Sequence, residues 1–435
     1  MASSAWRQTR RVALEVSGAL GSLGLFSAVS AAACGQPSPS TVGKPEGTVE
    51  VMSWGEGDPQ SPGWQARMAA FAVRYPTITV NSTVQAFGNG GQDYDAKLIA
   101  LAAAGTPPDV TYTDGTRLSN FYPRGIIQEL DTYIARSKFD KTPYPKAAWV
   151  ADERKGKVIA LPYRAQPYPF YINKDLYARM GVQLPAAAWT LDDLRDQGRR
   201  LTAPDGTQWG ISELASTVSR YSMFIWAFGG DFFDKDYTRC TLDAPEAVQG
   251  LQFIADLINR DRSHVPPGIA GVSWSAGNVA IQSNGAGRLP PVTPWPFQWR
   301  LATMPKGPKG ADVCLITNDW AMLKGAKNPE AAWALISWFS SDEGQKIIAE
   351  EDSLPANLKV ARASAYSKLD AESRQAAMKA LESGRPLPYD APLWGEVRPM
   401  WENELPRLWK GETTARELTQ RVVPLVNDKL KNAPR

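Results

Sequence analysis

Hydrophobic and polar residues alternate in two short segments near the start of the folded region. Val49 and Val51 share one face of a segment that ends at Trp54, and the stretch 78–84 repeats the alternation. A period of two residues is typical of β-strands. The stretch between them, 64–74, has the composition of a helix. The pattern therefore predicts a strand, a helix and a second strand that pairs in parallel with the first in an α/β sheet.

Two later segments carry hydrophobic residues three or four positions apart, which is the spacing of one helix face. In the first, Pro245 precedes Leu251 and Ile254; the second, 328–339, begins with Asn328 followed by proline and glutamate. Proline at the first helical position and asparagine before it are typical of a helix start. We expect two amphipathic helices that pack on a sheet, the second of them capped by Asn328.

The stretch 157–175 combines apolar and aromatic residues with interruptions. A short apolar strand at 158–161 meets Pro162, a polar aromatic passage follows at 163–169, and a second apolar strand is expected at 170–173. Proline removes a backbone donor and interrupts regular pairing. An extended passage with two interruptions is typical of a chain that crosses from one lobe to another.

The first residues have the pattern of an export signal. Arg7, Arg10 and Arg11 precede an uncharged stretch rich in Gly, Ser and Ala at 16–33. The length approaches that of a membrane span, but the N-terminal position, the basic front and the small residues at the end favour a signal peptide over residues 1–33. The consecutive arginines also resemble the twin-arginine motif, and export by the Tat or the Sec route stays open.

Small residues before Cys34 resemble a bacterial lipobox, with Ala31 where leucine is most common. The residues after it are rich in Pro, Ser and Gly, which is the composition of a flexible tether, expected over 34–47. We expect acylation of Cys34 and anchoring of the protein outside the cytoplasmic membrane. The alternative is ordinary cleavage after Ala33 and free secretion.

Composition excludes several classes of function. The 435 residues suggest two or three domains, and 48 Lys and Arg against 45 Asp and Glu leave a formal charge of +3, too small to indicate a nucleic acid partner. A single histidine, His264, makes histidine metal sites and most familiar catalytic chemistry improbable. Cys240 and Cys314 are either a disulfide or two buried thiols. The 16 tryptophans outnumber both Tyr and Phe.

Several short motifs, in order along the chain, resemble the extracellular solute-binding proteins of ABC importers, family 1, whose best-known members bind maltose and other sugars. The motifs are Val-Met-Ser-Trp at 51–54, Pro-Asp-Val-Thr-Tyr-Thr-Asp-Gly at 108–115, Gly-Lys-Val-Ile-Ala-Leu-Pro-Tyr at 156–163, Tyr-Ile-Asn-Lys-Asp-Leu at 171–176, Phe-Gly-Gly at 228–230 and Asn-Pro-Glu-Ala-Ala-Trp at 328–333. The resemblance covers essentially all of the chain from residue 48 onwards.

The resemblance implies the two-lobed periplasmic-binding-protein fold of type II. Each α/β lobe would contain a mixed or parallel sheet flanked by helices, and crossing hinge strands would join the lobes. Carried onto this chain, the first lobe would comprise 48–159 and 315–365, and the second 160–314 and 366–435.

The resemblance also implies a function without catalysis or a cofactor. The protein would be the substrate-binding lipoprotein of an ABC importer that captures a mono- or oligosaccharide between its lobes by hinge closure. It would act as a monomer on the outer face of the cytoplasmic membrane or in the periplasm. Its partners would be the permease transmembrane subunits, with the ATPase on a separate chain, because no phosphate-binding Gly-x-x-x-x-Gly-Lys-Ser/Thr motif occurs here.

A sugar site needs aromatic rings for the apolar sugar faces and short polar groups for the hydroxyls. Trp54 and Glu56 fall in a glycine-rich loop after the first strand, where α/β sheets place ligands, although Trp54 could instead close the core. Asp114 could bind hydroxyls or cap the next helix. The remaining expected ligand residues, placed by the resemblance, are Tyr163, Gln166, Tyr221, Asn284, Asn318, Trp320 and Trp394, with Arg398 or Trp401 as substitutes for Trp394.

Two other interpretations stay open. An anchored glycoside hydrolase would need two facing carboxylates, which Glu56, Asp114 and Asp231 could supply. A binder of glycerol phosphates or other polar solutes would use arginines as anion partners, from Arg164, Arg220 and Arg398.

Overall fold

The computed structural model describes residues 43–287, 295–351, 353–364 and 369–432. The predicted signal peptide 1–33, Cys34 and most of the predicted tether lie outside the described residues. Within the described residues, no helix combines the length and the apolar composition that a membrane span requires.

The predicted strand–helix–strand unit is confirmed. Strand β1 (Gly47–Ser53) pairs in parallel with β2 (Ile78–Val84), and helix α1 (Pro62–Arg74) connects them. The Ser61 side chain caps α1 by accepting a hydrogen bond from the Trp64 amide. On its other edge β1 pairs in parallel with β3 (Val110–Asp114). The carboxyl ends of these strands therefore meet at one edge of a parallel sheet.

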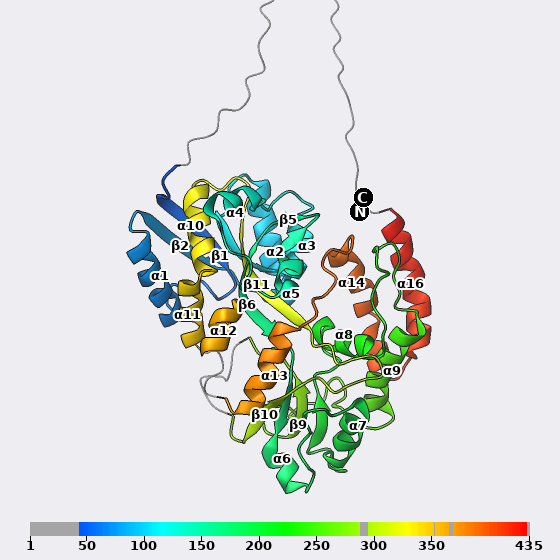
Figure 1. Ribbon diagram of the computed structural model, residues 1–435. Coiled ribbons are helices and arrows are strands. Elements are labelled where there is room, and N and C mark those ends of the chain that lie inside the picture. Colours follow the sequence, from blue (N-terminus) through cyan, green and yellow to red (C-terminus); the bar gives the residue numbers. More distant parts are fainter. Residues whose placement is uncertain (1–42, 288–294, 352, 365–368, 433–435) are drawn as a thin grey trace, which may run out of the picture. The chain divides into compact units, whose positions relative to one another are not determined.

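Two antiparallel strands complete this sheet. Strand β11 (Leu315–Met322) pairs with β3 on one side and with β6 (Leu161–Pro167) on the other, giving the order β2-β1-β3-β11-β6. A β-bulge shifts the β11–β6 register between Asn318 and Asp319. In Figure 1, β6 and β11 lie next to each other near the middle of the ribbon.

A second sheet has the order β10-β7-β9-β8. Its strands are β7 (Phe170–Asn173), β8 (Trp209–Ser212), β9 (Val279–Ser283) and β10 (Trp299–Ala302), with β8 and β9 parallel and the other pairs antiparallel. A two-stranded ladder of β4 (Glu153–Arg154) and β5 (Lys157–Val158) stands apart from both sheets.

The chain passes between the two sheets at a short crossing segment. Strand β6 belongs to the first sheet and β7 to the second, so the change of sheet occurs at Tyr168 and Pro169. The predicted lobe boundary, residue 160, lies directly before β6, whereas the observed change of sheet lies directly after it. Strand β11 returns to the first sheet from Leu315, the residue predicted for the return.

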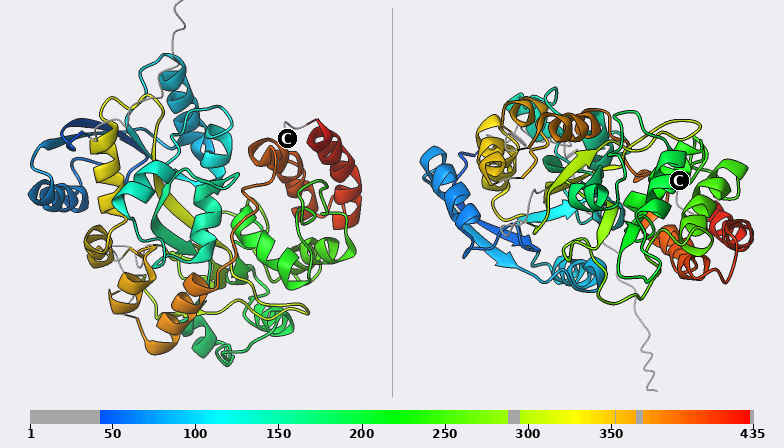
Figure 2. Two further views of the ribbon diagram at one scale, coloured as in Figure 1. Left: turned by 45° about the horizontal axis from the view of Figure 1, so that its top comes forward. Right: turned by 90° about the horizontal axis from the view of Figure 1, so that it is seen from below.

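We call each sheet with its helices a lobe. Lobe 1 contains α1, α2 (Gly88–Ala103), α3 (Gly115–Phe121), α4 (Asp131–Ser137), α5 (Lys146–Asp152), α10 (Pro329–Phe339), α11 (Asp342–Glu350) and α12 (Leu358–Ser364). Lobe 2 contains α6 (Lys174–Arg179), α7 (Leu191–Arg200), α8 (Val218–Ala227), α9 (Pro245–Asn259), α13 (Ala371–Glu382), α14 (Trp394–Glu402), α15 (Leu405–Trp409) and α16 (Ala415–Lys431). Both views of Figure 2 place the C-terminal helices beside α8 and α9.

The two predicted amphipathic helices are α9 and α10, and both bury their apolar face. One detail of the prediction is wrong. Asn328 occupies the cap position of α10, but its side chain makes no capping bond and instead donates to the Thr48 carbonyl oxygen at 2.7 Å. The residue therefore ties the start of α10 to β1.

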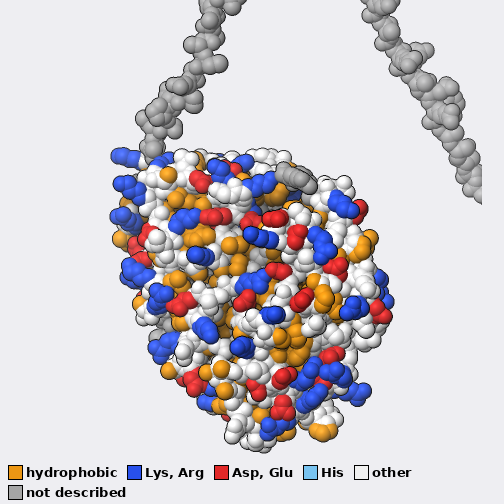
Figure 3. All heavy atoms as spheres, turned by 45° about the vertical axis from the view of Figure 1, so that its right-hand side comes forward, with side chains coloured by type: hydrophobic (Ala, Val, Ile, Leu, Met, Phe, Trp, Pro, Cys, Tyr) orange, Lys and Arg blue, Asp and Glu red, His pale blue; other side chains and the backbone are white. Residues whose placement is uncertain are grey.

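Each lobe has a core of its own. The core of lobe 1 contains Trp64, Trp320, Trp333 and Trp338, and the core of lobe 2 contains most of the buried side chains of α8, α9 and α14 to α16. Cys240 and Cys314 are both buried free thiols, so the two residues pack in the interior and do not form a disulfide. On the face shown in Figure 3, Lys and Arg side chains are interspersed with Asp and Glu, so no broad field of one sign forms there.

Candidate ligand-binding site

A cavity of about 660 Å³ opens in lobe 2. This volume is within the range of pockets that bind small molecules. The cavity is bounded by the end of β8, the start of α8, the loop 264–274 and helices α14 and α15. Its polar and aromatic lining consists of Ser212, Glu213, Ser216, Thr217, Tyr221, His264, Ser273, Trp274, Arg398, Glu402 and Trp409.

The loop after β8 brings Glu213 to the cavity. Its backbone is in the left-handed region, with φ of 70°, which is costly for a residue with a side chain. Such strain persists only where surrounding contacts enforce it. The Glu213 side chain is 44% exposed and lies 3.5 Å from the guanidinium of Arg220.

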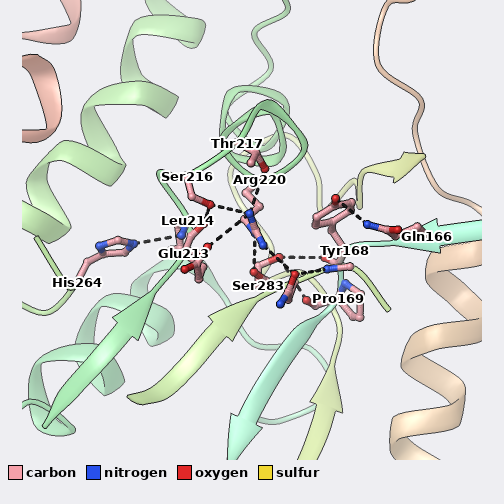
Figure 4. A network of polar contacts seen from close by, with 12 residues as sticks. Gln166, Tyr168, Pro169, Glu213, Leu214, Ser216, Thr217, Arg220, His264 and Ser283 are labelled. Atoms are coloured by element: carbon pink, nitrogen blue, oxygen red, sulfur yellow. Dashed lines mark hydrogen bonds and ion pairs between the residues drawn. The ribbon is translucent and has the colours of Figure 1, made fainter. Parts of the chain in front are cut away.

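Arg220 supplies those contacts, as Figure 4 shows. The buried guanidinium donates to the Ser283 carbonyl oxygen at 2.8 Å, to the Ser216 hydroxyl at 2.6 Å and to the Asn284 side-chain oxygen at 2.8 Å. It also lies 5.5 Å from the centre of the Tyr168 ring. One arginine thus connects the cavity loop, the end of β9 and the crossing segment.

His264 fixes the other side of the same loop. Its Nε2 accepts from the Leu214 amide at 3.1 Å, and its Nδ1 is 2.8 Å from the Val265 carbonyl oxygen. Burial lowers the pKa of His264 to about 4. The ring is therefore neutral, with both nitrogens engaged, and its function is structural.

Helix α14 contributes the charged part of the wall. The Tyr221 hydroxyl accepts from Trp401 Nε1 at 3.1 Å and donates to Glu402 Oε1 at 3.0 Å. Burial, and then the charge of Glu402, raise the pKa of Tyr221 well above its ordinary value, so the hydroxyl keeps its proton. Glu402 Oε2 lies 3.5 Å from Arg398 Nε, and each of these two side chains is about one quarter exposed.

On the cavity wall, Trp274 Nε1 is a buried donor without a hydrogen-bond partner, and Arg398 Nε makes no hydrogen bond beyond its ion pair with Glu402 at 3.5 Å. Buried polar groups without partners are costly. Four other tryptophans also bury an indole N–H without a hydrogen-bond partner: Trp226, Trp320, Trp338 and Trp394. Trp274 differs from these four because it lies on the wall of the large cavity. A ligand that offers acceptor oxygens would satisfy both donors.

The predicted site residues of lobe 1 have a different environment. Glu56 is 6% exposed. Its carboxylate is ion-paired with Arg164 and lies 3.3 Å from Arg67, while the Tyr163 hydroxyl is 3.4 Å away. Tyr163 is fully buried. This buried charge cluster, Glu56, Arg67, Tyr163 and Arg164, connects the loop after β1 with α1 and β6.

Trp54 keeps part of its surface exposed. Its ring packs against Tyr94 and Tyr112, and the guanidinium of Arg117 lies 4.9 Å from the ring centre. Asp114 caps α3, accepting from the Arg117 amide at 3.0 Å, and forms an ion pair with the Arg117 side chain. Of the two roles predicted for Asp114, the structure shows the cap.

Trp320 and Trp394 are fully buried. Trp320 packs among Trp64, Tyr112, Tyr163 and Phe339, and Trp394 among Phe232, Phe233, Tyr389 and Trp401. In this conformation neither ring has a face that a sugar could contact. Both rings contribute to the cores of their lobes, and their stacking on a ligand stays a prediction.

The remaining predicted residues lie close to the crossing segment or in β11. Gln166 donates to the Tyr168 hydroxyl at 3.0 Å, and Asn284 is exposed beside Arg220. Asn318 is half-buried, opposite Asp114 and Arg164 in the sheet register. Of the ten predicted ligand residues, Tyr221 lines the large cavity.

Three further wall residues, Glu213, Trp274 and Glu402, were not predicted from the sequence. Glu402 stands one helical turn after Arg398, a spacing that was visible in the sequence. No local pattern marks Glu213 or Trp274, because their loops reach the cavity through pairing with distant strands. Among the described residues, no group of three or more His, Cys, Asp or Glu side chains could hold a metal ion.

Residues 57–346 match the family model described as bacterial extracellular solute-binding protein. A maltotriose-binding protein of Pyrococcus abyssi is 27% identical over 273 residues, which cover 58% of this chain and 54% of that protein.

Solved structures show the same fold. An ABC substrate-binding protein from Listeria monocytogenes, in complex with cycloalternan, superposes with a TM-score of 0.78 at 22% identity and covers 89% of this chain and 99% of its own. UgpB from Mycobacterium tuberculosis, in complex with glycerophosphocholine, gives a TM-score of 0.75 at 18% identity over 88% and 99%. The predicted type II periplasmic-binding fold is confirmed, and the match over most of the chain shows that it belongs to the bacterial extracellular solute-binding proteins.

Proposed function

We propose that the protein captures an uncharged mono- or oligosaccharide in the lobe 2 cavity and delivers it to an ABC permease. The observation that carries the proposal is the mixture of hydrogen-bonding groups on one cavity wall. Trp274 Nε1 is a donor without an acceptor, Arg398 Nε has only the Glu402 carboxylate at 3.5 Å, and Glu213 and Glu402 are carboxylates that accept. A sugar hydroxyl donates and accepts, so a polyol complements both kinds of group.

The same wall argues against a purely anionic ligand. A phosphate would pair with Arg398, but the carboxylates of Glu213 and Glu402 line the same cavity and would repel it. Of the other two arginines considered for an anion, Arg164 pairs with Glu56 and Arg220 is engaged by Ser216, Ser283 and Asn284. Like charges that face one cavity repel each other. A zwitterion such as glycerophosphocholine is the second candidate, since its cation would face the carboxylates.

Binding rather than hydrolysis is supported by the state of the three carboxylates considered for catalysis. Glu56 pairs with Arg67 and Arg164, Asp114 with Arg117, and Asp231 with Arg385. None of the three lines the large cavity. A glycosidase needs two carboxyl groups that flank one bond.

Export and anchoring complete the proposal. Residues 1–33 act as the signal peptide, and acylation of Cys34 retains the monomeric protein on the outer face of the cytoplasmic membrane. The support is the run of small residues before Cys34 and the Pro-rich, Ser-rich stretch after it. Labelling with radioactive palmitate should mark the wild-type chain, and Cys34→Ala should abolish the label. An unlabelled wild-type chain would overturn the anchor.

The proposed ligand class is tested by calorimetry with maltotriose and with glycerophosphocholine. We expect heat from the sugar, and no sugar product on long incubation. Arg398→Gln should weaken sugar binding by about 10- to 100-fold, because it removes a charged donor worth about 1.5–3 kcal/mol. Trp274→Phe should weaken it by about 5-fold through the loss of one neutral hydrogen bond.

The matched control is Trp209→Phe. Trp209 also donates an indole hydrogen bond, to the Gly206 carbonyl oxygen at 3.1 Å, but it does not line the cavity. Its affinity for the sugar should equal that of the wild type. Binding of glycerophosphocholine with no response to the sugar would favour the zwitterion. A wild-type Kd unchanged in Arg398→Gln and Trp274→Phe would remove the cavity from consideration.

A further inference from the structure

An asparagine followed by a glycine stands directly after strand β9. Asn284 is exposed, and the Gly285 amide donates to the Asn284 side-chain oxygen at 2.8 Å. The asparagine side chain is therefore folded back over the peptide bond that follows it, which places its amide carbon, Cγ, beside the Gly285 nitrogen. Because Gly285 has no side chain of its own, nothing on this residue shields the nitrogen from Cγ.

Strands β6 and β7 hold this Asn–Gly step in place. The Gly285 carbonyl oxygen accepts from the Tyr171 hydroxyl at 3.4 Å. The next amide, that of Ala286, donates to the Pro167 carbonyl oxygen at 2.8 Å. Reacting atoms that a structure already holds next to each other react faster than the same atoms in a flexible chain. The fold thus favours a reaction between the Gly285 nitrogen and Cγ of Asn284.

Arg220 polarises the side-chain amide of Asn284. Its Nη2 donates to Asn284 Oδ1 at 2.8 Å. The guanidinium is itself held by the Ser216 hydroxyl and the Ser283 carbonyl oxygen, as Figure 4 shows. Arg220 is 9% exposed, so solvent screens its charge only weakly. A cation on a carbonyl oxygen makes the carbon more electrophilic and stabilises the negative charge that forms on the oxygen when a nucleophile adds.

We propose that Asn284 is a site of spontaneous covalent modification, at which the Gly285 nitrogen attacks Cγ of Asn284 and forms a cyclic imide. Hydroxide takes the Gly285 amide proton, a bond forms between this nitrogen and Cγ, and an electron pair moves onto Oδ1 beside Arg220. The bond from Cγ to the side-chain nitrogen then breaks. This nitrogen leaves as ammonia with a proton from water, which regenerates the hydroxide.

Water opens the imide in one of two ways. Attack at Cγ gives an aspartate with a normal main chain. Attack at the main-chain carbonyl carbon of residue 284 gives an isoaspartate, whose main chain runs through Cβ and Cγ and is longer by one carbon. Both products gain one negative charge next to Arg220. Only the isoaspartate also displaces Ala286, so we expect it to weaken the pairing of this loop with Pro167 of β6.

The proposal predicts that folding accelerates the reaction. The full chain is incubated at pH 9, folded in buffer or unfolded in guanidinium chloride, and the peptide that contains residue 284 is followed by mass spectrometry. A methyltransferase specific for isoaspartate identifies that product. We expect Asn284 to react about 10-fold faster in the folded chain, because the fold holds the two atoms together and adds Arg220. The other Asn–Gly step, at 89–90, lies on a different peptide and is followed separately.

Substitution of the arginine tests its contribution. Arg220→Gln removes the cation from Asn284 Oδ1, so the rate in the folded chain should fall about 10-fold, to that of the unfolded chain. The matched control is Arg200→Gln, because Arg200 is 53% exposed and pairs with Asp196 at 3.5 Å. Its rate at Asn284 should equal that of the parent. Circular dichroism identifies a variant that fails to fold, and the comparison of folded and unfolded wild type then decides.

The effect on the loop is measured separately. Chains with isoaspartate at position 284 are isolated by ion exchange and compared with Asn284→Asp, which has the same charge and a normal main chain. We expect the isoaspartate form to unfold at a lower urea concentration. Asn284→Gln should stop the reaction at this position, because its longer side chain would have to close a larger ring.

Each outcome decides one part of the proposal. If Asn284 reacts no faster in the folded chain than in the unfolded chain, the fold does not promote the reaction and the site is overturned. A faster reaction that Arg220→Gln slows and Arg200→Gln does not slow supports it. A folded Arg220→Gln that reacts at the parent rate would contradict the contribution of Arg220. Equal urea midpoints for the isoaspartate form and Asn284→Asp would contradict the effect on the pairing with β6.

Discussion

The buried charge cluster of lobe 1 and the cavity wall of lobe 2 are built from the same kinds of residue. In lobe 1, Glu56 is enclosed and has two arginine partners, Arg67 and Arg164. In lobe 2, Glu402 has Tyr221 and Arg398 beside it. Both regions contain a guanidinium Nε without a hydrogen bond, on Arg67 and Arg164 in lobe 1 and on Arg398 in lobe 2, but of these three only Arg398 lies on the wall of the large cavity. Aromatic and charged residues therefore indicate a ligand site where they line an open cavity, and a structural cluster where they are enclosed.

The largest loss of stability should follow from removing a buried tryptophan of lobe 1. Trp320→Ala removes a fully buried ring from the core, and we expect the free energy of unfolding to fall by about 3–5 kcal/mol. Urea unfolding measures the loss. Because Trp320 does not line the cavity, the folded variant should bind sugar as the wild type does. A large loss of affinity with little loss of stability would show that its ring faces the ligand after all.

A smaller effect is expected from the buried charge cluster. Glu56→Gln leaves the buried guanidinium of Arg164 without its charged partner, and removal of one member of a buried ion pair should cost about 3 kcal/mol of stability. The matched control is Glu372→Gln, because Glu372 is 71% exposed in its pair with Arg300 and should contribute less than about 1 kcal/mol. Equal denaturation midpoints for the two variants would contradict a structural role for Glu56.

The smallest effects concern pH, where the two lobes should respond in opposite directions. Burial lowers the pKa of His264 in lobe 2 to about 4, so the unfolded chain binds this proton first as the pH falls. From pH 7 to pH 5 the folded state should lose about 2 kcal/mol through His264. Burial raises the pKa of Asp95 in lobe 1 to about 6, against the influence of Arg117. The folded state binds that proton first, and gains under about 1 kcal/mol over the same range after solvent screening.

Urea midpoints at pH 7 and pH 5 test both signs. His264→Gln should reduce the loss of stability on acidification, and Asp95→Asn should increase it. The two variants thus act as controls for each other. If both substitutions changed the pH dependence of the urea midpoint in the same direction, these two groups would not set the pH response of their lobes.

The fold could be predicted from sequence because its elements have local causes. The alternation at 49–54 and 78–84 predicted β1 and β2, and Pro245 and Pro329 marked the starts of α9 and α10. The extended passage around Pro162 predicted the crossing between sheets, although the change of sheet comes later, at Tyr168 and Pro169.

The candidate site could be predicted only in small part. Tyr221 was predicted and lines the cavity, but Trp320 and Trp394 are packed inside the cores of their lobes. A tryptophan after a strand or in a loop has the same local sequence whether its ring meets solvent or a neighbouring helix. The burial of Trp394 depends on Phe232 and Trp401, which reach it from other parts of the chain.

By itself, the sequence determined the alternating strands and helices, the export signal that we propose and the family motifs along the chain. These depend on residue spacing and on neighbours within a few positions. Only the tertiary structure decided which tryptophans are core and which donors lack a partner. Burial and hydrogen-bond completion are properties of atoms brought together from distant positions, and no local pattern records them.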